Sequence, residues 1–321
     1  MIIKQIARAA TDFQQPVDEH DLRLQLEAVL THTEITRVSE IPGGHFNNTY
    51  QVHTSAESYI LKVAPVTGAD VFYNEHQLMQ RERSLSSLIQ AQNPLVPAYI
   101  SFFSIDGRDA FLQECIEGRL WHDEMESLSD RENNALWTQL GEFASTMHGC
   151  KTDKFGYPAS LQGHDRWSDF ILENVNGLVE DCHRLKVFHP EIAQYLELLA
   201  KHTELLDGVN EARLCHGDLW PRNVIIDGSG EDIQITAVID AERAYMGDPA
   251  SDWVLLLYGV PDAFWKGYGN NIVEKRDPVC INIYKGMYFI VNILEASRFQ
   301  QSDAQPRQWL AAVNTELLQG T

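Results

Sequence analysis

The hydrophobic and polar positions in the first third of the chain follow patterns typical of a small sheet and its helices. Leucines at helical spacing predict an amphipathic helix over residues 17–31. The runs TYQVHT and YILKVA, separated by SAES, predict a hairpin. An earlier strand is expected around Val38, and two more flank the turn IDGRD. With a helix over residues 70–90, N-capped by Asp70, residues 32–113 predict a small antiparallel sheet with one inserted helix.

The periodicity changes after Gly118. One helix is predicted over residues 133–149, and its buried side would carry Leu136, Leu140, Phe143, Ala144 and Met147. Residues 166–206 and the stretch NIYKGMYFIVNILEASRFQQ add further helical patterns. Two short apolar segments, within LCHGDLWPRNVII and VIDAERAYMGDP, lie between them. The second region is therefore expected to be mainly helical with a small β element.

Length and charge narrow the class of protein. A chain of 321 residues suits two lobes better than one core. Lysine and arginine total 25 against 46 aspartates and glutamates, so the net charge is −21. Nucleic-acid-binding proteins usually carry a basic face, so no nucleic-acid partner is expected. Such a field would attract a cationic substrate, and it also serves solubility.

The cysteines and the apolar windows bear on the cellular compartment. Five scattered cysteines without paired spacing predict a reducing compartment, with neither disulfides nor a zinc site. The start of the chain shows no signal-peptide pattern, and the most apolar windows, DWVLLLYGV and GMYFIVNIL, are too short to span a bilayer. The sequence therefore predicts a cytoplasmic protein without a membrane partner.

Three polar residues lie at the mouths of the two short apolar segments. Asp218, Asn223 and Asp240 offer two carboxylates and a carboxamide, the hard oxygen ligands that Mg²⁺ prefers. A carboxylate can also accept a proton from a hydroxyl nucleophile, and phosphoryl transfer needs both functions. Taken singly, each residue is better explained as a turn former, in the case of Asp218 and Asn223, or as a strand-end cap, in the case of Asp240. In combination with the upstream features described next, the set favours a phosphoryl-transfer site.

Lys62 lies in the middle of the apolar strand YILKVAP. Burying an ammonium group without a partner is costly, so a carboxylate is expected near it. Glu75 on the next helix is the predicted partner, with Glu82 as the competing one. Lys62 would then hold nucleotide phosphates. The alternative is an edge strand on which Lys62 points to solvent.

Seven stretches of the chain together resemble the superfamily of aminoglycoside phosphotransferases, choline kinases and fructosamine kinases. They are GGHFNNTY, the lysine of YILKV, Glu75, LQECIEG, LGEFASTMHG, HGDLWPRNV and VIDAERAYMGDPASDW, and they cover roughly residues 36–260. The resemblance implies an α+β, two-lobed, protein-kinase-like fold. It implies an N-terminal nucleotide-binding lobe at 1–113, a hinge at 114–118 and a helical C-terminal lobe at 119–321.

The resemblance also assigns roles to the central residues. Asp218 would orient and deprotonate the acceptor hydroxyl, while Asn223 and Asp240 would bind Mg²⁺ between the nucleotide phosphates. Lys62 would contact the α- and β-phosphates of ATP or GTP and pair with Glu75. The remaining implied nucleotide-binding residues are Gly43, Gly44, Asn47, Asn48, Thr49 and the backbone of Glu114 and Ile116. His216 and Asp252 are implied as supports of the catalytic loop, and Glu242 as a second metal contact or a structural residue.

The motifs that mark protein kinases, HRD, DFG and APE, are not found, which favours a small-molecule acceptor. Carboxylates around a tryptophan would suit an ammonium-bearing acceptor. The candidate acceptor residues are Asp165, Trp167, Asp169, Glu173 and Glu295. A solvated helix face with a core tryptophan is the alternative interpretation of the same residues.

The sequence thus predicts an ATP- or GTP-dependent kinase that phosphorylates a hydroxyl group of a small, amine-bearing molecule. The acceptor classes considered are aminoglycosides, amino alcohols and ketoamines. Two alternatives belong to other classes. One is a catalytically inactive, nucleotide-binding scaffold or sensor, and the other is a structural protein with no nucleotide site.

Overall fold

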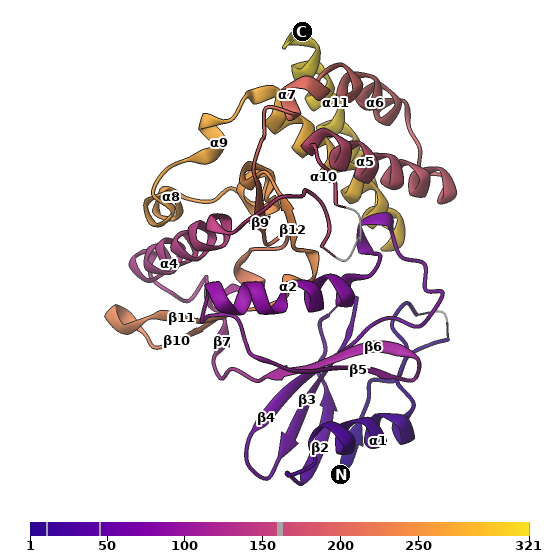
Figure 1. Ribbon diagram of the computed structural model, residues 1–321, viewed down its shortest axis with the longest axis vertical. Helices are drawn as coiled ribbons and strands as arrows, with labels where there is room; N and C mark the ends of the chain where they lie inside the picture. The colour runs from indigo at the N-terminus through magenta and orange to yellow at the C-terminus, as the bar shows by residue number, and fades with distance from the viewer. Residues whose placement is uncertain (11, 45, 159–162, 321) are drawn as a thin grey trace.

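The computed structural model describes residues 1–10, 12–44, 46–158 and 163–320. A six-stranded sheet forms the lower part of the molecule in Figure 1, and its strand order is β1-β2-β3-β4-β6-β5. The first strand pairs parallel with the second, and all other pairs are antiparallel. The strands are β1 (Ile2–Lys4), β2 (Ile35–Glu40), β3 (Asn48–Thr54), β4 (Ser58–Val63), β5 (Tyr99–Ile105) and β6 (Arg108–Glu114).

Local sequence explains most of this sheet. Asp106 and Gly107 join β5 to β6 with φ angles of 54° and 68°, the left-handed pair that an Asp-Gly hairpin turn requires. Alternate residues of the strands, such as Val52 and Leu61, are fully buried against helix α1 (Glu19–Val29). The predicted hairpins and the first helix are therefore confirmed. The parallel strand β1 was not predicted.

The predicted helix over residues 70–90 with an Asp70 cap is wrong at its start. Helix α2 spans Leu78–Gln92, after a short 3₁₀ turn at Tyr73–Glu75 and a left-handed Gln77 with φ of 59°. Asp70 is exposed and pairs with Arg184 instead of capping a helix. Glu75 is drawn into tertiary ion pairs, described below, and these override the local helical preference.

The second lobe is mainly helical, as predicted. Its helices are α3 (Trp121–Glu124), α4 (Asp130–Gly149), α5 (Trp167–Arg184), α6 (Pro190–Lys201), α7 (Thr203–Leu206), α8 (Asp262–Tyr268), α9 (Ile272–Lys275), α10 (Pro278–Arg298) and α11 (Ala304–Gln319). Its short strands are β7 (Arg119–Leu120), β8 (Lys151–Thr152), β9 (Ala212–Cys215), β10 (Val224–Asp227), β11 (Gln234–Val238) and β12 (Tyr245–Gly247). They form two small sheets, ordered β11-β10-β7 and β12-β9-β8. The fold class is therefore α+β.

Helix α10 is more extended than its apolar windows suggested. Among the described residues it is the one helix that could cross a membrane by length and composition, and 61% of its most apolar window is buried inside the protein. It packs against α5 and α11, and Ile283, Ile290 and Leu294 have no solvent exposure. Burial of this kind is typical of a core helix.

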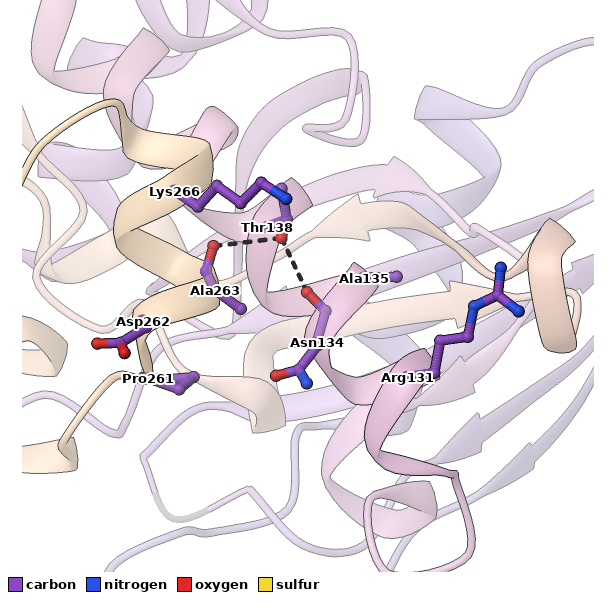
Figure 2. Close-up of a pocket in the computed structure, with 8 residues that line it drawn as sticks. All are labelled: Arg131, Asn134, Ala135, Thr138, Pro261, Asp262, Ala263 and Lys266. Carbon is purple, nitrogen blue, oxygen red and sulfur yellow. Dashed lines mark hydrogen bonds between the residues drawn. The ribbon is translucent and has the colours of Figure 1, made fainter.

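Helices α4 and α8 approach each other closely. The hydroxyl of Thr138 donates to the carbonyl of Ala263 at 3.2 Å, as well as to Asn134 in its own helix at 2.9 Å (Figure 2). At Gly141 an added Cβ would lie 2.1 Å from the carbonyl oxygen of Phe264. Only a residue without a side chain fits between these two backbones.

We therefore expect Gly141→Ala to lower the free energy of unfolding by about 1–3 kcal/mol or more, because the added methyl group forces the helices apart. Gly149→Ala in the same helix is the matched control. A Cβ at Gly149 meets nothing within 4 Å, and alanine is the better helix former by about 1 kcal/mol at most. Urea unfolding would measure both variants. Equal stability of the two would contradict this account of the α4–α8 contact.

Candidate active site

The loop HGD between β9 and β10 is held by a buried carboxylate. Asp252 has no solvent exposure, and its two oxygens accept the backbone N–H groups of His216 at 2.9 Å and Gly217 at 3.2 Å. Burial lowers the pKa of His216 to about 4, so its ring is neutral at pH 7. Asp252 therefore fixes the backbone immediately before Asp218.

Asp218 and Asn223 face each other across this loop. The Asn223 side-chain nitrogen donates to the Asp218 carboxylate at 2.7 Å and to its carbonyl at 2.8 Å. The amide oxygen of Asn223 is thereby left for another partner. Burial raises the pKa of Asp218, and the positive charge of Arg243 opposes that rise. The arrangement orients one carboxylate oxygen and one amide oxygen on neighbouring positions of the loop.

Lys62 reaches this loop from the other lobe. Its side chain is 7% exposed and forms an ion pair with Asp240, which follows β11. Asp240 has a φ of 66°, so the chain turns sharply at this residue. Lys62 is therefore buried and paired, and the alternative of a solvent-facing lysine is wrong.

The predicted ion pair between Lys62 and Glu75 is wrong. Glu75 accepts two hydrogen bonds from Arg298, both at 2.7 Å, and lies 3.5 Å from Arg243. Because α2 begins only at Leu78, Glu75 is not part of that helix.

Glu82 is the acid on α2 that lies near Lys62. It is 1% exposed and accepts the hydroxyl of Tyr99 at 2.6 Å. Burial raises the pKa of Glu82, and the charge of Lys62 opposes this. The charge of Lys62 thus acts on Glu82, the competing partner considered from the sequence, but the ion pair of Lys62 is with Asp240.

The glycine-containing loop joins β2 to β3 beside the same site. Gly43 has a φ of 107°, and Gly44 next to it is exposed. The side chain of Asn47 donates to the carboxylate of Glu242, while that of Asn48 donates to Glu40 at 2.8 Å. Thr49 lies opposite Lys62 in the β3–β4 pair; His45, quoted within this motif, lies outside the described residues.

The expected hinge follows β6. The backbone N–H of Glu114 donates to the carbonyl of Ala98 at 2.8 Å, so this group is already used within the protein. Glu114 also pairs with Tyr59 of β4 in the sheet, and Ile116, beyond the strand, is half-buried.

The candidate acceptor carboxylates on α5 and just before it are already paired. Asp165 pairs with Lys154, and Asp169 accepts two hydrogen bonds from Arg166, at 2.7 and 3.0 Å. Glu173 accepts the hydroxyl of Tyr73 at 2.5 Å and lies 3.0 Å from His164. This side of α5 therefore offers no group of unpaired carboxylates.

Trp167 belongs to the core. Its side chain has no solvent exposure, its ring stacks on Tyr245 at 6.2 Å, and its Nε1 donates to the hydroxyl of Tyr284 at 2.9 Å. The alternative interpretation, a core tryptophan on a helix with a polar outer face, describes α5.

Glu295 on α10 differs from these carboxylates. Its backbone carbonyl accepts the N–H of Phe299 at 2.9 Å, and its side chain has no ion pair among the described residues. Burial raises its pKa, an effect that the charge of Arg243 reduces and the charge of Asp218 reinforces.

Arg243 is a functional candidate that the sequence analysis missed. Burial lowers its pKa, but the carboxylates of Glu75, Asp218 and Glu295 raise it more. The only signal for it in the sequence is a cation within the acidic motif VIDAER.

Of two cavities in the structure, one is lined by residues of this site and the other is not. A cavity of about 50 Å³ is lined by Gly217 and Arg243 beside the catalytic loop. A wider depression of about 600 Å³ lies between α4 and α8, where Arg131 and Lys266 stand on either side (Figure 2). None of its lining residues comes from the catalytic loop, so it is separate from the site.

Comparison with protein families shows to which family a chain with this group of residues belongs. Residues 37–279 match the model of the phosphotransferase enzyme family. The chain belongs to this family. It is therefore a phosphotransferase that acts on a hydroxyl group, as the sequence predicted. The sequence has no significant match among curated proteins.

Solved structures show that the phosphotransferase has the predicted protein-kinase-like fold. It resembles the GDP complex of a mutant aminoglycoside 2′-phosphotransferase-IIIa, with a TM-score of 0.64, 18% identity, and coverage of 94% of this chain and 97% of that chain. It also resembles the gentamicin–APH(2″)-IIa complex, with a TM-score of 0.61, 18% identity, and coverage of 95% and 97%. The streptomycin–ATP–APH(2″)-IIa ternary complex gives a TM-score of 0.57, 17% identity, and coverage of 90% and 98%.

The oxygen donors of the phosphotransferase fit a magnesium ion. Asp240 supplies a carboxylate with a 33% exposed side chain, and Asn223 an amide oxygen that its own hydrogen bonds leave free. Glu242, two residues after Asp240, adds a second carboxylate, which is buried. Hard oxygen ligands of this kind suit Mg²⁺ rather than a softer metal.

The variant Glu75→Gln tests the ion pairs that Glu75 makes with Arg298 and Arg243. It removes the negative charge that both guanidinium groups contact, so we expect the free energy of unfolding to fall by about 3–5 kcal/mol. Glu211→Gln is the control, because Glu211 pairs with Lys151 and Arg213 at the surface with 45% exposure. Exposed pairs contribute about 0–1 kcal/mol. Thermal unfolding that shows similar losses in both variants would remove Glu75 from this role.

Proposed function

We propose that this phosphotransferase is an ATP- or GTP-dependent kinase that transfers the γ-phosphate to a hydroxyl group of a small, amine-bearing acceptor. One observation carries the proposal. A buried lysine from the sheet, Lys62, meets Asp240 beside the paired Asp218 and Asn223. A cation for phosphates, oxygen ligands for a metal and a carboxylate for the acceptor thus gather in one place.

The roles of the residues follow from their chemistry. Asp218 is the group that accepts a hydrogen bond from the acceptor hydroxyl, orients it toward the phosphate and takes up its proton. Asn223 holds the Asp218 carboxylate by its amide nitrogen, which limits the rotation of the carboxylate. Lys62 neutralises nucleotide phosphate charge. Asn223 and Asp240 would hold Mg²⁺, which supplies charge neutralisation between the phosphates when bound.

Two kinds of observation support a nucleotide, ATP or GTP, as the phosphate donor. Similar structures were determined as GDP and ATP complexes, and the loop with Gly43 and Gly44 lies next to Asn47, whose side chain reaches Glu242. Exposed glycine backbone of this kind lets phosphates approach closely. Gly43, Gly44, Asn48 and Thr49 are proposed as further nucleotide contacts, with backbone groups of Glu114 and Ile116 for the base.

Charge supports an acceptor that carries an amine. The chain has a net charge of −21, and the charges of Arg243 and Asp218 both act on the Glu295 carboxylate. Because Asp165, Asp169 and Glu173 are paired elsewhere, one ammonium group fits the site better than several. We therefore favour a small monoamine alcohol over a polycationic aminoglycoside.

We propose that the enzyme works in the cytoplasm. The cysteines of the protein are free, which agrees with a reducing compartment.

A catalytically inactive, nucleotide-binding relative is the second candidate. It would bind nucleotide through the same Lys62 and Asp240 but transfer no phosphate. The presence of Asp218 in a fixed, hydrogen-bonded position favours the active enzyme.

Asp218→Asn tests the proposal. It keeps the shape of the side chain but loses the charge and the basicity, so we expect turnover to fall roughly 100-fold or more. Nucleotide affinity should change little, because the phosphates are held by other residues. The acceptor is sought in a panel of amino alcohols, ketoamines and aminoglycosides, with nucleotide consumption as the measurement.

Asp227→Asn is the matched control, because Asp227 is exposed at the end of β10. Its turnover should equal that of the unaltered enzyme. Near-normal turnover in Asp218→Asn would remove this residue from the catalytic role. Nucleotide binding without turnover of any acceptor in the panel would favour the inactive relative.

A further inference from the structure

The segment between β1 and α1 is fixed against the sheet at both of its ends. The side chain of Gln5 exchanges two hydrogen bonds, each of 2.8 Å, with the backbone N–H and carbonyl of Val17. The carbonyl of Gln15 accepts a hydrogen bond at 3.0 Å from Arg108, a buried residue of β6. The part of this segment that the structure describes is therefore held close to the sheet.

Gln14 reaches from this segment to the glycine-containing loop between β2 and β3. Its side-chain nitrogen donates to the backbone carbonyl of Asn47 at 2.7 Å. A Cβ added to Gly44 would lie 3.5 Å from the same carbonyl oxygen, so the loop folds back on itself here. Gln14 therefore holds the loop at the point where Asn47 approaches Gly44.

Asn47 is also held by the helical lobe. Its side chain donates to the carboxylate of Glu242, and the residue is buried. Glu242 lies two positions after Asp240, the carboxylate that pairs with Lys62. The backbone of Asn47 is thus fixed from the sheet lobe, and its side chain is fixed by the segment that carries Asp240.

Arg8 supports both Gln14 and the base of the loop. Its guanidinium donates to the side-chain oxygen of Gln14 at 3.2 Å and pairs with Glu40 at 2.6 Å. Glu40 is the last residue of β2, and it accepts a hydrogen bond at 2.8 Å from Asn48, the first residue of β3. Arg8 therefore connects Gln14 to the two residues between which the loop runs.

The glycines leave the loop with little packing of its own. Gly43 and Gly44 are exposed, and a Cβ added to Gly43 would meet nothing within 4 Å. Glycine is also the residue with the greatest conformational freedom. A flexible segment that becomes ordered when a ligand binds loses conformational entropy, and this loss weakens binding. A hydrogen bond that orders the loop in advance therefore increases its affinity for phosphates.

We propose that Gln14 is a positioning residue for the nucleotide phosphates. By holding the carbonyl of Asn47 it keeps the glycine-containing loop in the conformation that contacts them, and Arg8 supports it in this role. The inference rests on the proposed kinase function. It adds a residue from outside the motif GGHFNNTY on which phosphate binding depends.

The variant Gln14→Leu tests the proposal in calorimetric titrations with Mg²⁺·ADP and Mg²⁺·GDP. It removes the donor to the carbonyl of Asn47. We expect the nucleotide that the unaltered protein binds more tightly to lose affinity about threefold to tenfold, the effect of one hydrogen bond. Gln14→Met, which keeps the unbranched shape of the side chain, should show the same loss. Circular dichroism would show that both variants are folded.

Gln25→Leu is the matched control. Gln25 is also half-buried, and its side chain donates one hydrogen bond, to Asp21 of α1 at 3.1 Å. The control therefore makes the same change at a position that has no contact with the loop among the described residues. Its nucleotide affinity should equal that of the unaltered protein.

The matching nucleoside, adenosine or guanosine, separates positioning of the loop from general damage to the site. A nucleoside carries no phosphate, so its affinity should be the same in Gln14→Leu and in the unaltered protein. General damage would weaken the binding of nucleoside and nucleotide alike.

Unchanged nucleotide affinity in both Gln14 variants, or an equal loss of affinity for the nucleoside, would overturn the role of Gln14. The kinase function fails in a different way. Weaker nucleotide binding in Gln14→Leu, by a protein that transfers phosphate to no acceptor in the panel, would support the positioning role and contradict the kinase. If neither nucleotide binds to the unaltered protein, the proposed kinase is contradicted and the inference fails with it.

Discussion

The ion pair between Lys62 and Asp240 joins the two lobes of this protein at its active site. A lysine with 5% exposure requires a carboxylate partner, because an uncompensated buried ammonium group is strongly destabilising. The lysine comes from β4 in the sheet lobe, and the carboxylate follows β11 in the helical lobe. The ion pair therefore fixes β4 of the sheet lobe relative to the segment that follows β11 in the helical lobe. It also places the cation beside the loop that carries Asp218 and Asn223.

Further buried carboxylates organise the catalytic loop around this contact. Asp252 holds the backbone that leads to Asp218, and Glu75 links Arg298 of α10 to Arg243. Each is compensated by hydrogen bonds or cations, so the site contains many charges at little net cost.

The sequence predicted the features whose signals are local. The turn at Asp106 and Gly107, the buried face of α4 and the spacing of Asp218, Asn223 and Asp240 could be read directly. The partner of Lys62 could not, because the start of α2 depends on the ion pair of Glu75 with Arg298, which is 223 positions away. Arg243 had no motif of its own. Its importance follows from its contact with Glu75, which only the folded chain brings near it.

The role of Lys62 is the most direct test of the central claim, and calorimetric titration of Mg²⁺·ADP into the unaltered protein and into Lys62→Met measures it. Lys62→Met keeps the length and apolar stem of the side chain but removes the charge. Hydrogen bonds to charged groups are typically worth about 1.5–3 kcal/mol, so we predict saturable binding that weakens roughly tenfold to a hundredfold in the variant. Circular dichroism would show that the variant is folded. Equal affinity in both proteins, or no binding to the unaltered protein at millimolar nucleotide, would contradict the account.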